Sequence, residues 1–323
     1  MVKIARTVSA LSDGAAIVVG LACLIAPLAG QGGRFSARLD VLNHFALLWF
    51  VGAALSLGYG LVFAAPSLRF AAAGLGLAGM LAAAALIAPE LMRPIRPNVS
   101  TDAPHQITLI QLNAWDENAD VEGTADWVAA QHPDLVLMQE VEAPILRAMI
   151  KRGFHHLRGM ARTAIFSRAE PTFAPFKIPM QDWRILPGFS RATFASAGGA
   201  YSVVSTHLDW PTRRDQASQI AVLAEVLDHY PTDRLILAGD FNLTPWSFTL
   251  RGLDTRLGME RRDRALFSWP VRLFPKAPLS WPLALLPIDH LYAGQAWRTV
   301  SIARGPRLGS DHYPIVVRLA LTQ

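Results

Sequence analysis

The sequence predicts an α/β protein: a four-layer α/β sandwich of two packed mixed β-sheets flanked by helices, preceded by three transmembrane helices. Three observations predict this. Three long apolar runs lie within the first hundred residues, short runs rich in Val, Ile, Leu and Thr recur beyond them, and helical patterns lie between some of the short runs. The chain therefore divides into a membrane region at 1–92, a linker at 93–106 and a folded domain at 107–323.

The three apolar runs span 14–30, 45–65 and 70–88, and none contains a charged residue. Each is close to the ~17–25 residues that a helix needs to cross a bilayer. A signal peptide would explain only the first run, and no small-residue cleavage site is followed there by a soluble sequence. The alternative is a single anchor with buried hydrophobic helices. We expect a multi-pass protein of the bacterial inner (cell) membrane, with the lipid bilayer as a partner.

The side of the membrane that the folded domain faces stays open. Three spans place the chain ends on opposite sides, and the basic residues near the spans divide three against four between those sides. The lone cysteine, Cys23, lies in the first span, so the folded domain has no thiol that would report its redox compartment.

Pro94, Pro97 and Pro104 mark the linker. The residues beyond it are enough for one sizeable domain with its own core. Short apolar runs predict its strands, and apolar residues at helical spacing predict helices at 122–131 and 214–229. The strands are expected at 107–115, 135–141, 164–168, 191–195, 201–208, 234–241, 288–293 and 313–320.

The overall charge carries little information about the substrate. The sequence pI is about 9.7, but the first hundred residues hold seven Lys and Arg against three acidic residues, which leaves 23 against 22 elsewhere. The one arginine-rich stretch, 251–276, also contains acidic residues, and we expect it to form a solvated face. A protein that tracks a nucleic-acid backbone usually has a basic stripe, so charge does not argue for DNA.

Polar residues stand at the ends of several predicted strands. The same segments contain Asn113, Gln139-Glu140, Thr206-His207-Leu208, Gly239-Asp240-Phe241-Asn242, Ile288-Asp289-His290 and Ser310-Asp311-His312-Tyr313-Pro314. These motifs, in this order, resemble the endonuclease/exonuclease/phosphatase family of metal-dependent phosphoesterases, as a membrane-anchored bacterial-type member. The resemblance covers about 107–320 and implies hydrolysis of a phosphodiester or phosphomonoester by in-line attack of an activated water.

A hard divalent cation, Mg²⁺ or Mn²⁺, is the implied cofactor, because such ions take oxygen ligands. We expect Glu140 to be the leading ligand, Asn113 to supply an amide oxygen, and Asp311 to add a second carboxylate from the opposite sheet.

Asp240 and Asn242 lie two apart on a segment that we expect to be extended, which would turn both side chains to one side and Phe241 into the core. The resemblance implies that Asp240 orients or deprotonates the attacking water and that Asn242 donates a hydrogen bond to the phosphate.

The resemblance also pairs Asp289 with His312, because a carboxylate on one imidazole nitrogen fixes the tautomer and raises the basicity of the other. His312 would either deprotonate water or stabilise the pentacovalent phosphorane. His207 would contact the scissile phosphate or protonate the leaving group, whereas His290 is expected to be structural. Arg214 is a candidate for binding substrate phosphate, with an exposed helix start as the alternative.

The expected substrate is a phosphoester in a nucleic acid, a phospholipid headgroup or a small molecule. Residues 265–287 contain Phe267, Trp269, Phe274 and Trp281, which would either cover the core or form a rim that touches lipid. No protein partner is inferred. The alternative function is a non-catalytic membrane-tethered scaffold, although a degenerate copy should have lost at least one of the site residues named above.

Overall fold

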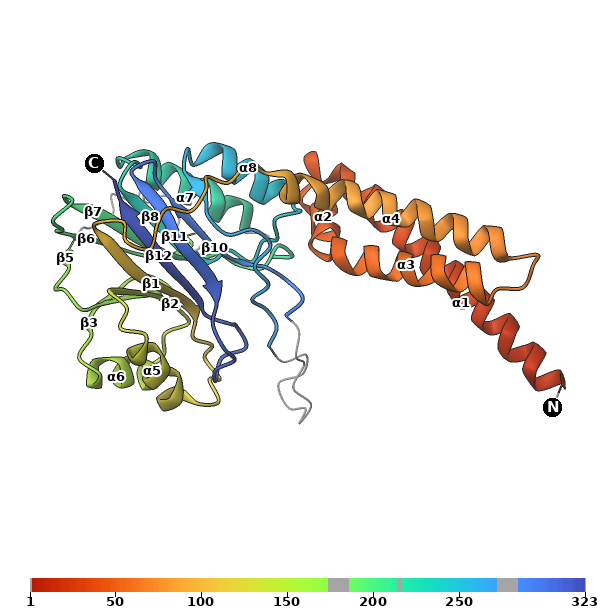
Figure 1. Cartoon of the computed structure of the whole chain (residues 1–323), viewed down its shortest axis with the longest axis horizontal. Coiled ribbons are helices and arrows are strands. Elements are labelled where there is room, and N and C mark those ends of the chain that lie inside the picture. The colour runs from red at the N-terminus through yellow and green to blue at the C-terminus, as the bar shows by residue number, and fades with distance from the viewer. Residues whose placement is uncertain (1, 174–185, 214–215, 272–283, 323) are drawn as a thin grey trace. The chain divides into compact units, whose positions relative to one another are not determined.

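The computed structural model describes residues 2–173, 186–213, 216–271 and 284–322. By its internal contacts the chain divides into two compact units. We call residues 1–93 and 244–251 the helical unit, and residues 94–243 and 252–323 the sandwich unit. Figure 1 labels most of the helices and strands of both units.

The helical unit contains three long helices, as the sequence predicts. They are α1 (Val2–Gly30), α3 (Ala46–Val62) and α4 (Arg69–Met92). The turn between α1 and α3 contains α2 (Ala37–Asp40) and two short 3-10 helices, Gln31–Arg34 (η1) and Val41–Phe45 (η2). The spans Thr7–Arg34, Ala37–Val62 and Arg69–Met92 are long and apolar enough to cross a membrane, with mean hydropathies of 2.0, 1.9 and 2.1.

Glycines let α3 and α4 approach closely. A Cβ on Gly76 would lie 2.4 Å from the backbone nitrogen of Leu57, and one on Gly60 would lie 2.5 Å from that of Ala73. Small residues at such positions allow apolar helices to pack without a hydrophobic driving force between them. The sequence of these helices therefore suits association within lipid.

The sandwich unit consists of two mixed sheets. In the first sheet the strand order is β11 (Trp297–Arg304), β12 (Ile315–Leu321), β1 (Gln106–Asn113), β2 (Leu135–Gln139), β4 (Ala164–Ser167) and β3 (His155–Arg158). In the second sheet it is β5 (Thr172–Phe173), β6 (Gly188–Phe194), β7 (Tyr201–His207), β8 (Leu235–Asp240), β10 (Asp289–Ala293) and β9 (Glu260–Arg261). The pairs β1–β2 and β7–β8 are parallel, whereas β12 and β10 run antiparallel to their neighbours.

Apolar side chains fill the space between the sheets. Leu109, Leu137 and Ile165 of the first sheet belong to one buried cluster with Val203 and Ile236 of the second. The outer face of the first sheet packs against α5 (Val121–Ala130) and α6 (Ala143–Lys151). Helix α7 (Gln216–Asp228) lies on the far side of the second sheet (Figure 1). The predicted layered sandwich is confirmed.

The remaining helix, α8 (Phe248–Arg256), begins in the helical unit and ends in the sandwich unit. Local signals place α5, since the Asp120 side chain accepts a hydrogen bond from the Gly123 N–H at its first turn. The proline-rich segment 93–105 forms neither helix nor strand.

Four strands are absent from the prediction: β3, β5, β9 and β11. Strand β3 contains His155 and His156, which are exposed and pair with β4. Strands β5 and β9 have two residues each, and β11 ends in the exposed residues Ala303 and Arg304, so none of them carries the apolar signature of a covered strand.

The arginine-rich stretch is only in part the solvated face that the sequence suggested. Arg256 and Arg264 are exposed, whereas Arg272 and Lys276 lie outside the described residues. Arg261 and Arg262 are each only 2% exposed. Arg261 pairs with the carboxylates of Asp254 and Asp263, and Arg262 donates to three backbone carbonyl groups. These partners compensate the burial of charge, and a count of charges along the sequence does not reveal them.

Candidate active site

Strand pairing brings three of the predicted residues side by side. In the second sheet, Asp240 is the direct partner of His207 on β7 and of Asp289 on β10. Asp240 and Asp289 are each 1% exposed. The parallel β7–β8 pair and the antiparallel β10 therefore place two carboxylates and one imidazole at a single rim.

The first sheet supplies the facing residues. Asn113 and Gln139 are partners at the ends of β1 and β2, and Glu140 follows directly. The prediction that Asp311 comes from the opposite sheet is wrong. Strand β12 pairs with β1, so Asp311 and His312 precede a strand of the same sheet that carries Asn113.

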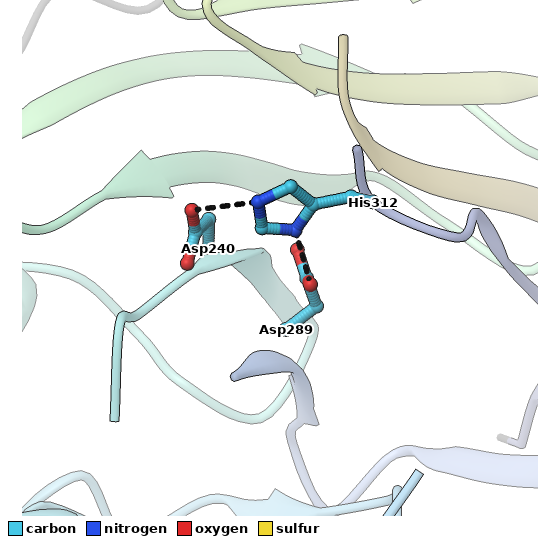
Figure 2. Close-up of side chains that lie close together, drawn as sticks. All are labelled: Asp240, Asp289 and His312. Atoms are coloured by element: carbon cyan, nitrogen blue, oxygen red, sulfur yellow. Dashed lines mark hydrogen bonds and ion pairs between the residues drawn. The ribbon is translucent and has the colours of Figure 1, made fainter. Parts of the chain in front are cut away.

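His312 lies between two carboxylates (Figure 2). Its Nδ1 donates to Oδ2 of Asp289 at 2.8 Å, and its Nε2 lies 3.7 Å from Oδ2 of Asp240. The other oxygen of Asp289 accepts from Nε2 of Gln111 at 2.6 Å. Ser310 holds the backbone, since its hydroxyl accepts from the His312 N–H and donates to the carbonyl of Asn113.

These neighbours set the charge of His312. Burial alone would lower the pKa of His312, but the carboxylates of Asp289 and Asp240 more than offset this effect and raise the pKa to about 10. Burial raises the pKa of Asp240 to about 6, against the opposing influence of His312. Near neutral pH the geometry therefore favours an imidazolium beside an ionised Asp240.

Asn113 links the carboxylates of Glu140 and Asp240. Its Nδ2 donates to Oε1 of Glu140 and to Oδ2 of Asp240, both at 3.0 Å. Its Oδ1 accepts from the backbone N–H of Trp115 at 3.0 Å. The oxygen expected to bind a metal thus faces Trp115 in this structure. His207 approaches the same carboxylates, with its Nε2 at 3.5 Å from Asp240 and 3.9 Å from Glu140.

Asn242 differs from the expectation of an extended segment. Strand β8 ends at Asp240, and Asn242 has a left-handed backbone with φ of 51°. The backbone turns here because Oδ1 of Asp240 accepts from the Asn242 N–H at 2.9 Å, while the Asn242 side-chain amide donates to the carbonyl of Leu208 at 2.8 Å. Phe241, as predicted, is fully buried. Within the described part of the chain, the Asn242 Oδ1 is buried without a hydrogen-bond partner.

Left-handed backbone gathers around this rim. Trp115, Glu140, Arg162 and Asn242 have φ values of 61°, 53°, 61° and 51°. Such conformations cost roughly 1–3 kcal/mol each and persist where the surroundings fix them, which is frequent at functional sites. Sequence patterns of strands do not predict them.

A pocket of about 330 Å³ opens onto the array. Trp115, Trp210 and Trp269 line it together with Arg162 and Arg213. Trp269 also donates to Oδ2 of Asp311 at 2.9 Å, and its ring lies 5.0 Å from that of Trp210. Within the predicted loop 265–287, Trp269 therefore borders the pocket, while Phe274 and Trp281 lie outside the described residues.

The structure assigns positions to all predicted site residues except Arg214, which also lies outside the described residues. His290 is fully buried, with one ring nitrogen 2.7 Å from Asp263 and the other 2.8 Å from the carbonyl of Leu243. The residue that the sequence analysis missed is Gln111. Its position two residues before Asn113 on the same face of β1 is the signal that could have found it.

The donor set fits a hard cation. Asp240, Asp289 and His312 can bring one ligand atom each within 4.8 Å of one another, but both oxygens of Asp289 are engaged and an imidazolium does not bind metal. Asp311 is the better candidate, together with Glu140. Burial raises the pKa of Asp311, as does the charge of Glu140, and its Oδ1 has no hydrogen-bond partner among the described residues. A cation would relieve this crowding of carboxylates.

The structure defines an α/β sandwich of two mixed sheets with carboxylates and imidazoles gathered at one rim. The sequence pattern of the Endonuclease/Exonuclease/phosphatase family matches residues 109–312. The chain belongs to this family. No curated protein matches it.

Solved structures of low sequence identity share the fold. An endonuclease/exonuclease/phosphatase from Bacteroides vulgatus has a TM-score of 0.53 at 14% identity, over 67% of this chain and 99% of that one. A protein of the same description from Beutenbergia cavernae has a TM-score of 0.52 at 18% sequence identity, and the match covers 68% of this chain and 72% of that one. An endonuclease/exonuclease/phosphatase family protein from Bacteroides thetaiotaomicron has a TM-score of 0.51 at 16% sequence identity, and the match covers 68% of this chain and 99% of that one.

Proposed function

We propose that this chain is a divalent-metal-dependent phosphoesterase that its three apolar helices hold in a membrane. The observation that carries the proposal is the buried Asp289–His312–Asp240 array at the base of the pocket. Family membership supports hydrolysis of a phosphoester in general. The length and composition of the helices support the membrane location.

Asp240 accepts the proton of the attacking water in this proposal. Its pKa of about 6 leaves it ionised near neutral pH and still basic enough to take a proton. His312, charged and oriented by Asp289, stabilises the negative charge that develops on the phosphoryl oxygens. Of the two roles that the sequence left open for this histidine, its raised pKa favours stabilisation over deprotonation of water.

His207 and Asn242 complete the proposed site. The imidazole of His207 is half-buried beside Asp240 and Glu140, where it can contact the phosphate or protonate the leaving oxygen. Asn242 is oriented by Leu208, so its amide contributes to binding phosphate only if that hydrogen bond is exchanged. Exposed Arg213 lines the pocket, and Arg214 keeps its proposed role from the sequence alone.

Glu140 and Asp311, with Asn113, would hold the Mg²⁺ or Mn²⁺ ion. When bound, the ion supplies positive charge that polarises the phosphoryl oxygens. Reorientation of the Asn113 amide would present its oxygen as a ligand, at the loss of the bond from Trp115.

The test uses the full chain in detergent micelles with Mg²⁺, Mn²⁺ or EDTA. The substrates are plasmid DNA, short RNA, phosphatidylinositol phosphates, sphingomyelin and bis-p-nitrophenyl phosphate, so that the arms separate nucleic acids, lipid headgroups and small esters. We expect EDTA-sensitive hydrolysis that Asp240→Asn lowers by about 10²–10⁴-fold.

Asp126→Asn is the matched control, because that carboxylate is 73% exposed and pairs with Arg152 at the surface. Its rate should equal that of the unmodified chain. Equal rates for Asp240→Asn and this control would overturn the mechanism. If the folded protein hydrolyses none of these substrates, the result would favour the non-catalytic scaffold.

A further inference from the structure

The turn between the first two long helices holds the segment that follows the Asp240–Asn242 loop. That segment, Thr244–Arg251, belongs to the helical unit, although the residue before it, Leu243, belongs to the sandwich unit. The proposed water-activating residue is therefore four residues along the chain from a backbone that packs with the apolar helices.

Asp40 is the main attachment point within the helical unit. It is 2% exposed, and its carboxylate accepts four hydrogen bonds. The donors are the Phe248 N–H at 2.9 Å, the Thr249 N–H at 2.8 Å, the Thr249 hydroxyl at 2.6 Å and the Asn43 amide at 2.7 Å. Because a carboxylate at a helix N-terminus satisfies free N–H groups and meets a favourable dipole, Asp40 fixes the start of α8.

His44 fixes the beginning of the segment. Its Nδ1 accepts from the Thr244 backbone N–H at 3.1 Å, and its carbonyl accepts from the Trp246 indole at 3.3 Å. A ring nitrogen that accepts from a backbone N–H carries no proton, so the imidazole is neutral with its proton on Nε2. Among the described residues that buried Nε2 has no hydrogen-bond partner, so its burial is uncompensated.

Two further observations indicate a built attachment. Arg251 donates to the carbonyl of Leu86 on α4. A Cβ on Gly33 would lie 2.8 Å from Oδ1 of Asp40 and 2.9 Å from its Cα, so this glycine permits the close turn that presents the carboxylate.

We propose that Asp40 and His44 are positioning residues for the catalytic loop, and that they couple the membrane helices to hydrolysis. This inference rests on the proposed function. Each residue has only two soft backbone torsions, so a shift of Thr244 is transmitted to Asn242 within two residues. The left-handed Asn242 needs fixed surroundings on both sides. Asp240 and Leu208 hold it within the sandwich unit, and Thr244, two residues further along the chain, is held by His44 within the helical unit.

The experiment compares Asp40→Asn with Asp13→Asn in the full chain, reconstituted in lipid nanodiscs. Asp13 is an equally buried carboxylate of the helical unit, where it accepts a hydrogen bond from the Tyr59 hydroxyl. Hydrogen–deuterium exchange of residues 236–250 reports the anchoring directly. Hydrolysis of bis-p-nitrophenyl phosphate reports kcat and KM.

We expect Asp40→Asn to speed exchange at Asp240–Thr244 and to lower kcat by about tenfold or more with little change in KM, because misplacement of a catalytic group by ~1 Å costs up to ~10²-fold. Asp13→Asn should leave both unchanged. Unchanged exchange in Asp40→Asn would overturn the inference, as would faster exchange with an unaltered kcat.

A second pair of variants keeps the test decisive if Asp40→Asn fails to fold. His44→Gln retains an acceptor for the Thr244 N–H, whereas His44→Leu does not. We expect His44→Gln to restore most of the kcat that His44→Leu loses, and equal values would contradict the positioning role. An unmodified chain that hydrolyses nothing counts against the proposed function alone, and the exchange data then decide the anchoring by themselves.

Discussion

At the scale of single residues, the charge of His312 depends on Asp289. The imidazole is buried, and burial opposes its protonation; the adjacent carboxylates reverse that preference. Because the folded-state pKa is raised above the ordinary value of 6.5, protonation of His312 stabilises the fold. This contribution is fully present below pH 6.5 and is lost as the pH rises through about 10.

Asp289→Asn should therefore change the pH dependence of stability. In EDTA, we expect the difference in Tm between the unmodified chain and this variant to be largest near pH 6.5 and to narrow toward pH 10, as measured by differential scanning fluorimetry. The raised pKa of Asp240 changes the stability between about pH 4 and pH 6, which lies below this pH range. Asp126→Asn serves as the control, and its difference in Tm from the unmodified chain should not vary with pH. A difference for Asp289→Asn that does not vary with pH would contradict the assignment.

The gathering of most candidate-site residues at one rim was predictable, but the orientation of their side chains was not. Polar residues at the ends of apolar strands identified Asn113, Glu140, His207 and Asp240, since strands of a sheet end at common rims. The left-handed turn at Asn242 and the contact of Trp269 with Asp311 depend on tertiary hydrogen bonds. No local pattern in the sequence encodes these bonds.

At the scale of elements, a buried ionic network fastens β9 and β10 to α8. Asp263, 1% exposed, accepts from His290, Arg261 and the Leu291 N–H. Burial alone would raise the pKa of Asp263, but His290 and these other partners hold it well below its usual range. Arg261 reaches on to Asp254, which lies on α8.

Asp263→Ala should be strongly destabilising because it leaves the Arg261 guanidinium buried without this carboxylate. We expect the free energy of unfolding to fall by roughly 3–5 kcal/mol. Chemical denaturation in detergent would measure the loss. Asp126→Ala, at an exposed position, should stay within about 0.5 kcal/mol of the unmodified chain. Equal midpoints for the two variants would refute this account of the network.

Strands were predictable where both of their faces are covered. All five residues of β2 and all six of β8 are buried, and their sequences are apolar almost throughout. Strand β3 is mostly exposed, and its pairing follows from the hairpin with β4. The sequence pattern reports burial, so it finds central strands and misses edge strands.

At the scale of the whole molecule, three helices are long and apolar enough to cross a membrane. Each offers a window of mean hydropathy near 2, and Leu55 and Leu81 are exposed on their surfaces at 69% and 65%. Each predicted span overlaps one of these long helices, because continuous apolarity needs no tertiary information.

We expect the chain to stay in the membrane pellet after alkaline carbonate extraction. Leu55→Arg with Leu81→Arg should reduce the pelleted fraction, since an arginine at the centre of a span costs about 2.5–3.5 kcal/mol. Leu55→Ile with Leu81→Ile is the matched control. Release of the unmodified chain into the supernatant would exclude membrane-spanning helices.

The order of strands in the first sheet has a consequence for biosynthesis. Strand β12, the last of the domain to leave the ribosome, lies between β11 and β1, which is the first. At a synthesis rate of ~5–20 residues per second, one edge of β1 stays unpaired for roughly 10–40 s until β12 has been made. During translation this open edge is a template for mispairing, and a chaperone that shields it would raise the yield of folded protein. Since Asp311 and His312 immediately precede β12, the nascent domain gains its complete site only as this gap closes.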